Sequence, residues 1–147
     1  MELISHSEKE TQALAAKLAE KSNGGTVLAL VGDLGSGKTA FAKGFAAGLG
    51  VTETVASPTY VILKVYQVSG NKQGITQLAH FDLYRLASFD DAEGVGLAEI
   101  INDKDTISLI EWPEKAAPLL NGREVRKLYF EYLSENDRKI TYDDTIY

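Results

Sequence analysis

Gly32-Asp33-Leu34-Gly35-Ser36-Gly37-Lys38-Thr39 matches the pattern G-x-x-x-x-G-K-[ST], in which a glycine-rich turn joins a strand to a helix. The glycines let the backbone bend so that successive N–H groups point inward at phosphate oxygens. A helix that begins near Lys38 would present its free amides and the positive end of its dipole to the same anion. The segment therefore predicts a phosphate-binding loop. Lys38 would reach the β- and γ-phosphates, and the Thr39 hydroxyl would ligate magnesium.

The residues on either side of the loop favour this interpretation. Residues 26–31 form a continuous apolar run rich in β-formers, which is typical of a strand buried on both faces. Phe41, Phe45 and Leu49 then recur every four residues and predict a helix that ends at Gly50. A strand before the loop and a helix after it are the context that phosphate binding requires. The alternative is a glycine-rich turn without a ligand.

The rest of the chain alternates between predicted strands and helices. A short strand is expected at Leu3-Ile4, and a helix is expected from Ser7 to the glycines at 24–25. Further expected elements are a hairpin (60–68 and 77–83), a loop leading into a short helix (90–102), a strand (106–110) and a C-terminal hairpin (125–133 and 139–142) with a frayed acidic end. These elements predict an α/β fold of the P-loop NTPase type, in which a mixed sheet with a parallel centre and antiparallel hairpin additions is flanked by helices.

Composition limits the class of partner. The chain of 147 residues is predicted to form one domain over residues 1–147, with a net charge of −6 and a pI of about 4.9. A free-standing nucleic-acid binder usually has a basic surface, so contact with RNA is expected only through a partner protein. The absence of cysteine excludes disulfides and thiolate metal sites. Because neither a signal peptide nor an apolar run of membrane-spanning length is recognised, we expect a cytoplasmic location and no membrane contact.

A carboxylate follows the predicted strand at 106–110. Glu111 would emerge at the C-terminal end of that strand, where the ligand sites of open α/β sheets lie. An acid at this place would join the magnesium shell in the Walker B arrangement, with Glu in place of the commoner Asp. The alternative is an ordinary charge at a strand end.

A second carboxylate lies in the segment His80-Phe81-Asp82-Leu83-Tyr84-Arg85. Strand alternation places His80, Asp82 and Tyr84 on one face. Asp82 could position the attacking water or hold a water of the magnesium shell, and the alternative is the solvated face of an edge strand. His80 either belongs to the site or is a hydrogen-bonded structural histidine.

Two other features have both a functional and a structural interpretation. Ser57-Pro58-Thr59 follows the predicted P-loop helix, where many P-loop enzymes have a switch loop that senses the γ-phosphate; a simple turn is the alternative. Trp112, the only tryptophan, adjoins Glu111. It either packs in the core or lies at the mouth of the site or on a partner surface.

Four motifs occur in a fixed order: the loop at 32–39, Ser-Pro-Thr-Tyr at 57–60, His-Phe-Asp-Leu-Tyr-Arg-Leu at 80–86 and Ile-Glu-Trp-Pro-Glu at 110–114. This series resembles the TsaE (YjeE) family of small bacterial ATPases over most of the chain. The resemblance implies a role in making threonylcarbamoyladenosine, the modified base beside the anticodon of tRNAs. It also implies that the protein joins the TsaB–TsaD pair and hydrolyses ATP to reset that complex, without performing the carbamoyl transfer itself.

The resemblance implies ATP and Mg²⁺ as cofactors and assigns them to particular residues. Lys38 would bind phosphate, Thr39 and Glu111 would hold magnesium, and Asp82 would be the hydrolytic or magnesium-linked carboxylate.

The resemblance extends to residues outside the loop and the two carboxylates. Thr59 would belong to the switch-like segment, and Trp112 would be functionally sensitive. Thr11 matches a threonine of the N-terminal helix that lies near the nucleotide. Ala40 stands where the family often has a second threonine, which leaves Thr39 untouched.

Three other functions compete with this interpretation. A small GTPase would need Asn-Lys-x-Asp, and the nearest match at residues 71–74 lacks the aspartate. A small-molecule kinase would need several arginines around a second pocket, but only Arg85 lies near a predicted site element, whereas Arg123, Arg126 and Arg138 are in the C-terminal region. A nucleotide-dependent adaptor without hydrolysis stays open, because no arginine finger is evident.

Overall fold

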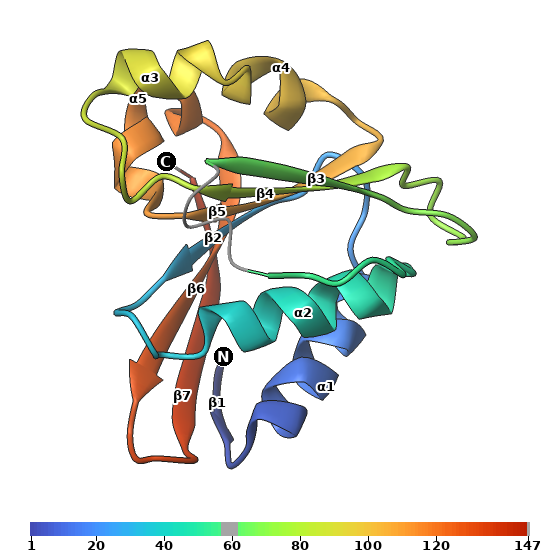
Figure 1. Cartoon of the computed structure of the whole chain (residues 1–147), viewed down its shortest axis with the longest axis vertical. Coiled ribbons are helices and arrows are strands. Elements are labelled where there is room, and N and C mark those ends of the chain that lie inside the picture. Colours follow the sequence, from blue (N-terminus) through green and yellow to red (C-terminus); the bar gives the residue numbers. More distant parts are fainter. Residues whose placement is uncertain (57–61, 147) are drawn as a thin grey trace.

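A mixed sheet runs through the molecule and carries helices on both faces (Figure 1). The computed structural model describes residues 1–56 and 62–146. Within them the strands are β1 (Glu2–Ser5), β2 (Val27–Val31), β3 (Leu63–Gln67), β4 (Gln77–Asp82), β5 (Thr106–Glu111), β6 (Glu124–Tyr132) and β7 (Arg138–Ile146). The helices are α1 (Glu8–Glu20), α2 (Lys38–Leu49), α3 (Phe89–Gly94), α4 (Leu97–Asn102), the 3-10 helix η1 (Pro113–Ala116) and α5 (Ala117–Leu120).

The strand order is β1-β7-β6-β2-β5-β4-β3. The central strand β2 pairs in parallel with both β5 and β6, and β5 pairs in parallel with β4. The outer pairs β1–β7, β6–β7 and β3–β4 are antiparallel. The predicted α/β fold, with its parallel centre and hairpin additions, is therefore confirmed. The parallel strands also bring the C-terminal ends of β2, β4, β5 and β6 to one edge of the sheet.

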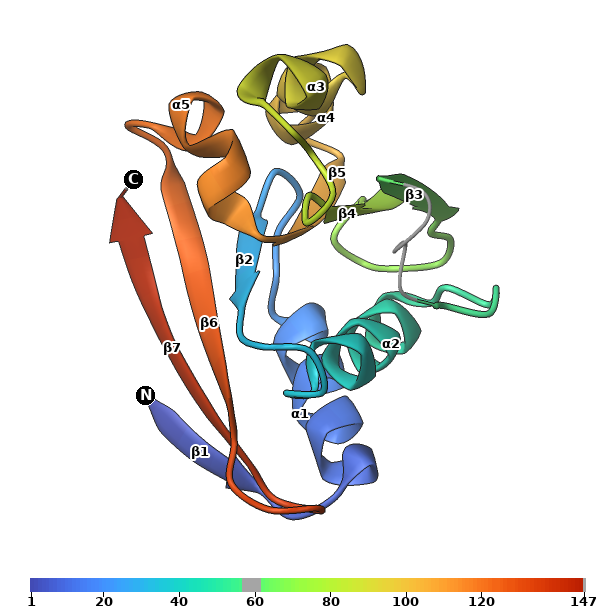
Figure 2. The same cartoon turned by 60° about the vertical axis from the view of Figure 1, so that its left-hand side comes forward.

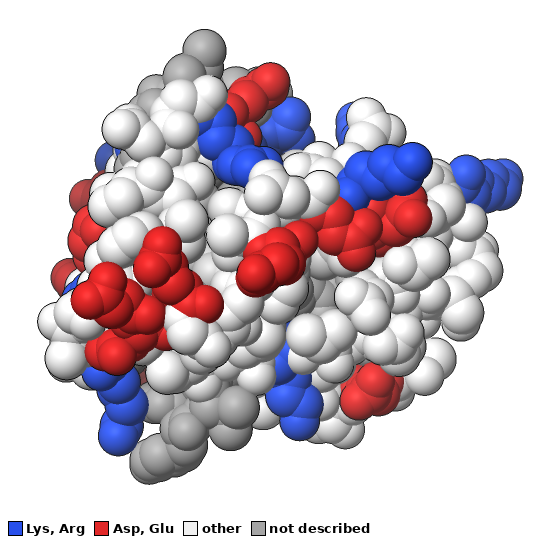
Figure 3. All heavy atoms as spheres, turned by 90° about the horizontal axis from the view of Figure 1, so that it is seen from above, with Lys and Arg blue, Asp and Glu red and all other residues white. Residues whose placement is uncertain are grey.

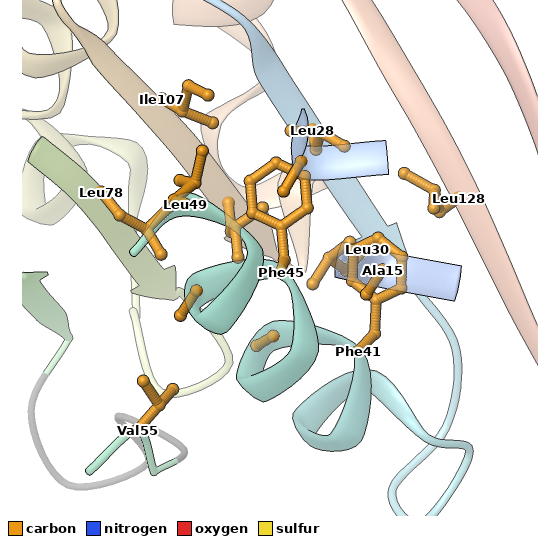
Figure 4. Packing of buried hydrophobic residues seen from close by; sticks show 14 of the residues in the cluster. Ala15, Leu28, Leu30, Phe41, Phe45, Leu49, Val55, Leu78, Ile107 and Leu128 are labelled. Atoms are coloured by element: carbon orange, nitrogen blue, oxygen red, sulfur yellow. The ribbon is translucent and has the colours of Figure 1, made fainter. Parts of the chain in front are cut away.

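Each face of the sheet has its own apolar core. On one face Phe41, Phe45 and Leu49 of α2 pack against Leu28 and Leu30 of β2 (Figure 4). Helix α1 lies beside α2 on this face, and α3, α4 and α5 cover the opposite face (Figure 2). The four-residue repeat of the α2 apolar side chains matches this one-sided burial. Burial of α2 fixes the position of the loop that precedes it.

Two sequence predictions about secondary structure are wrong in part. Residues 90–102 form two short helices and not a loop before one helix, because Ser88 and Asp91 make a reciprocal capping box at the start of α3. Gly96, at φ 78°, separates α3 from α4. The acidic C-terminus is not frayed: β7 continues to Ile146, where it pairs with Glu124 of β6. That the whole chain is one domain stays a prediction.

The surface charge follows the acidic composition. Asp90 and Asp91 lie in the first turn of α3, and Glu99 lies in the first turn of α4. Seen from above, acidic side chains gather in several groups, and lysine and arginine side chains lie beside some of them (Figure 3). The net charge of −6 disfavours direct binding of a phosphate backbone. In the part of the chain that the structure describes, no helix has the length and apolar character needed to cross a membrane.

Candidate active site

The loop at residues 32–37 leaves the C-terminal end of β2 and enters α2 directly. Gly37 is the residue before the helix and has φ 106°, a conformation that residues with a Cβ rarely adopt. The amide of Phe41 donates to the Gly37 carbonyl over 3.0 Å, so regular helical hydrogen bonding begins there. The backbone amides before that point have no partner within the helix and are available to an anion.

A cleft of about 490 Å³ opens beside this loop. Its volume lies within the usual range for small-molecule sites. Four parts of the chain supply its walls: the start of α1, the P-loop with the first turn of α2, the ends of β4 and β5, and the turn between β6 and β7. The lining residues are Ser7, Glu8, Thr11, Leu34, Gly35, Gly37, Lys38, Thr39, Ala40, Asp82, Tyr84, Arg85, Glu111, Trp112, Glu135, Asn136 and Arg138.

The ammonium group of Lys38 lies over its own loop. Its Nζ donates to the carbonyl oxygen of Gly32 and to that of Asp33, the latter over 2.9 Å. Burial lowers the pKa of Lys38, and the negative charges of Glu111 and Asp82 oppose that shift. Two carbonyl oxygens are weaker partners for an ammonium than an anionic oxygen. A phosphate in the loop would therefore draw Lys38 away from them.

The two predicted carboxylates lie side by side. Asp82 and Glu111 are paired residues at the ends of the parallel strands β4 and β5. The residues are only 8% and 3% exposed. Burial raises the pKa of Asp82, and the like charge of Glu111 raises it further, whereas the Tyr84 amide, which donates to Asp82 Oδ1 over 3.1 Å, lowers it. Two adjacent buried carboxylates are costly unless a cation or a proton accompanies them.

His80 lies behind this pair. Its Nε2 is 3.9 Å from Glu111 Oε1, and the residue is 1% exposed. Neither ring nitrogen has a hydrogen-bond partner within the part of the chain that the structure describes, so the interpretation of His80 as a hydrogen-bonded structural histidine finds no support there. The edge-strand alternative for Asp82 is wrong, because β4 lies between β5 and β3.

Trp112 forms part of the cleft wall next to Glu111. Its φ of 58° places a bulky residue in the left-handed region, at the point where the chain turns from β5 into η1. The indole ring lies 4.9 Å from the Tyr84 ring, and Lys38 Nζ lies 5.9 Å from the Trp112 ring centroid. Both interpretations of Trp112 apply in part, because its side chain also packs against the second core.

Three threonines were predicted to contact the nucleotide or its metal ion. Thr39 lines the cleft in the first turn of α2. Thr11 also lines the cleft, and its hydroxyl exchanges a 2.8 Å hydrogen bond with Ser5 Oγ. Thr59 lies outside the described residues. Within the loop, Leu34 is 79% exposed, and the buried Ser36 Oγ has no hydrogen-bond partner among residues 1–56 and 62–146.

Known proteins resemble this chain over nearly its whole length. A family model described as "Threonylcarbamoyl adenosine biosynthesis protein TsaE" matches residues 5–140. The chain belongs to the TsaE family. The Bacillus subtilis protein named tRNA threonylcarbamoyladenosine biosynthesis protein TsaE is 38% identical to this chain, and the match covers 91% of this chain and 79% of that protein. The Treponema pallidum protein of the same name is 35% identical, and the match covers 96% of this chain and 98% of that protein. A crystal structure of Bacillus subtilis YdiB superposes with a TM-score of 0.74 at 30% identity and covers 99% of this chain and 85% of that chain. The resemblance seen in the motifs is thus confirmed.

Besides the P-loop and the two carboxylates, the cleft has lining residues near the C-terminus that were not predicted from the sequence. Glu135, Asn136 and Arg138 belong to the turn between β6 and β7 and to the start of β7, and all three line the cleft. The placement of Arg138 away from the site was therefore wrong. No local pattern could have located it, because the parallel pairing of β6 with β2 is a contact between distant segments.

The residues of the cleft fit a magnesium nucleotide. No group of three or more His, Cys, Asp or Glu side chains that could hold a metal ion occurs within the described ranges. Mg²⁺ in nucleotide sites is commonly bound by one or two protein oxygens together with phosphate oxygens and water. Thr39, Glu111 and Asp82 supply oxygens of that kind, and the loop that carries Lys38 would hold the phosphates.

Proposed function

We propose that this TsaE-family chain is the magnesium-dependent ATPase of tRNA threonylcarbamoyladenosine biosynthesis. One observation carries the proposal: the P-loop lysine faces two buried carboxylates, Asp82 and Glu111, across a single cleft. The enzyme is weak alone and is activated in a complex with TsaB and TsaD homologues in the cytoplasm. It contacts tRNA only through these proteins and does not itself transfer the carbamoyl group.

Phosphate binding begins with Lys38. Its ammonium would leave the carbonyls of Gly32 and Asp33 for the β- and γ-phosphate oxygens, and the amides at the start of α2 would hold the remaining charge. Thr39 and Glu111 would hold the magnesium ion, which neutralises charge on the phosphates when it is bound. Gly35, Ser36 and Gly37 complete the backbone cradle.

Asp82 is the residue proposed to act on the attacking water. Its carboxylate lies at the strand end beside Glu111, and the Tyr84 amide holds one of its oxygens by a hydrogen bond. The raised pKa of Asp82 makes its ionised form a better proton acceptor than an ordinary aspartate. The carboxylate would orient water in line with the γ-phosphate, either as a base or through hydrogen bonds alone.

Activation by partners is consistent with the rim of the cleft. Leu34 is 79% exposed and Tyr84 is 49% exposed, and both line the opening. We infer that a partner covers these two side chains, because contact with their apolar surface would stabilise a complex. A partner seated there would exclude water and could supply a group that the chain lacks.

The test is phosphate release from ATP and from GTP with magnesium, first with the protein alone and then with TsaB and TsaD homologues from the same source. We expect ATP-selective turnover that rises with the partners. Lys38→Ala and Glu111→Ala should each abolish it, whereas Glu99→Ala, a glutamate of α4 outside the cleft, should not. ATP binding without turnover in either condition would favour the adaptor instead. Full turnover in both site variants would refute the site assignment.

A further inference from the structure

We propose that His80 is a positioning residue: its Nε2–H would hold one carboxylate oxygen of Glu111, so that the other oxygen faces the metal ion. The inference rests on the proposed function, in which Glu111 binds magnesium. It gives a role to a buried polar side chain that the P-loop and the two carboxylates leave unexplained. His80 itself would touch neither the nucleotide nor the metal ion.

The surroundings of His80 would suit an apolar side chain better. The residue lies in β4, where it pairs with Leu109 of β5 on one side and with Lys64 of β3 on the other. Strand alternation places it on the same face as Leu78, which belongs to the first core. His80 is 1% exposed, and neither ring nitrogen has a hydrogen-bond partner in the described ranges. Buried polar atoms without a partner destabilise a fold, so packing alone does not explain a histidine here.

The partner within reach is Glu111. Its Oε1 lies 3.9 Å from His80 Nε2, which is about 1 Å longer than an ordinary N–H···O hydrogen bond. The backbone of Glu111 is fixed, because β5 pairs with β2 and β4 at this point and the Leu83 amide donates to the Glu111 carbonyl oxygen. The terminal torsion of a glutamate is broad. Rotation of the carboxylate can therefore bring Oε1 toward the ring without any change in the sheet.

A donor from His80 would give Glu111 what Asp82 already has. The Tyr84 amide donates to Asp82 Oδ1 over 3.1 Å and so orients that carboxylate. His80 Nε2 is the corresponding nitrogen for Glu111. A neutral imidazole with its proton on Nε2 can donate this bond. A carboxylate that is held at one oxygen presents the other in a fixed direction, and such outer partners of metal ligands are commonly worth 10–100-fold in metal affinity, by order of magnitude.

The experiment separates the position of the N–H from the presence of a polar group. Glutamine places its amide near the position of Nε2, asparagine places it near Nδ1, and leucine has a similar size but no polar atom. Calorimetric titration would give the Kd of ATP with magnesium and with EDTA for the wild type and for His80→Gln, His80→Asn and His80→Leu. Urea unfolding of the proteins without ATP or magnesium would give their stability.

Ser108→Ala is the matched control for these variants. Ser108 is also buried, at 1% exposure, and its hydroxyl also has no hydrogen-bond partner in the part of the chain that the structure describes. The residue lies three positions before Glu111 on β5 and therefore on the opposite face of the sheet. Its replacement removes a buried, unpartnered polar group without touching the carboxylates, so this variant should bind ATP like the wild type in both conditions.

We expect His80→Leu to bind ATP about tenfold more weakly in magnesium and within about twofold of the wild type in EDTA, because the P-loop is unchanged. Its urea midpoint should equal or exceed that of the wild type, because the unpartnered nitrogens are gone. His80→Gln should stay within about threefold of the wild-type affinity in magnesium, whereas His80→Asn should lose affinity as leucine does.

Several results would overturn the inference while the proposed ATPase stands. These are wild-type affinity of His80→Leu in magnesium, an equal loss of affinity with and without magnesium, or a lower urea midpoint in all three His80 variants, which would assign the histidine a structural role. Equal affinities of His80→Gln and His80→Asn would also overturn it, and this comparison does not depend on the leucine variant. A wild type whose ATP affinity is the same in magnesium and in EDTA would instead overturn the proposed magnesium site itself.

Discussion

Replacement of Gly44 by alanine is expected to destabilise the protein, although alanine is the better helix former. Gly44 lies within α2, where it faces the backbone of α1. A Cβ at this position would lie 2.2 Å from the carbonyl oxygen of Gln12 and 2.4 Å from its Cα. Carbon atoms normally approach to about 3.5 Å, so α1 would have to move away by roughly 1 Å.

Two opposing effects determine how Gly44→Ala changes the free energy of unfolding. The helical preference of alanine over glycine favours the variant by about 1 kcal/mol. Overpacking of a close contact costs about 1–3 kcal/mol, and the upper part of that range applies when the obstacle is backbone, which cannot rotate away as a side chain can. We therefore expect a net loss of about 2 kcal/mol, which corresponds to a fall in Tm of roughly 4–8 °C for a chain of this size.

The assay is urea unfolding of Gly44→Ala beside Gly94→Ala, a second helical glycine. A Cβ on Gly94 would meet nothing within 4 Å, so that change should raise stability by about 0.5–1 kcal/mol. Helix α1 also carries Thr11, which lines the cleft, so Gly44→Ala should weaken ATP binding as well. If Gly44→Ala were as stable as the wild type with an unchanged m-value, the close packing of α1 on α2 would be refuted.

Three other substitutions test two carboxyl groups, Asp82 and Asp137, and the place of Trp112 in the cleft wall. Burial raises the pKa of Asp82, so its ionisation costs stability once the pH rises above the ordinary aspartate range. Asp82→Asn should therefore stabilise the free protein at neutral pH, lose that gain below the ordinary aspartate range and abolish turnover. A lower Tm at neutral pH would contradict this. His6→Ala removes the hydrogen bond that chiefly lowers the pKa of Asp137, so a carboxyl NMR titration should find that pKa raised toward its ordinary value; an unmoved titration would exclude the contact. The emission of Trp112 should change when ATP binds, and Trp112→Phe should remove the signal; emission that is insensitive to ATP would argue against its place in the cleft wall.

The sequence was most informative where local geometry decides the structure. A glycine at position 37 is required by a single φ of 106°, and the loop conformation depends on residues within one short segment. The places of Asp82 and Glu111 followed from strand alternation and from the rule that parallel strands end at one edge. The pairing of these two residues in the sheet agrees with both arguments. Their chemical roles stay predictions.

Sequence reasoning failed where distant segments decide the structure. Arg138 reaches the P-loop because β6 pairs with β2, a contact between residues about a hundred positions apart, and nothing in the residues 124–138 indicates it. The acidic end of the chain looked unsuited to a strand, yet β7 pairs with β6 on one side, and with β1 over part of its length on the other. Cross-strand hydrogen bonds thus outweigh a poor local composition at this end.

The buried charges explain why this site should depend on its ligand. Glu111 and Asp82 are held together at a strand end where water is largely excluded, and Lys38 faces them from its own loop carbonyls. Two buried carboxylates at one strand end repel each other, and the loss of their hydration adds to the cost of keeping both ionised in the free site. In the proposed function, a magnesium nucleotide would bring a cation to the carboxylates and an anion to Lys38 and the α2 amides. Its binding would then remove an electrostatic cost that folding imposes, so we expect occupancy of the cleft to stabilise the fold.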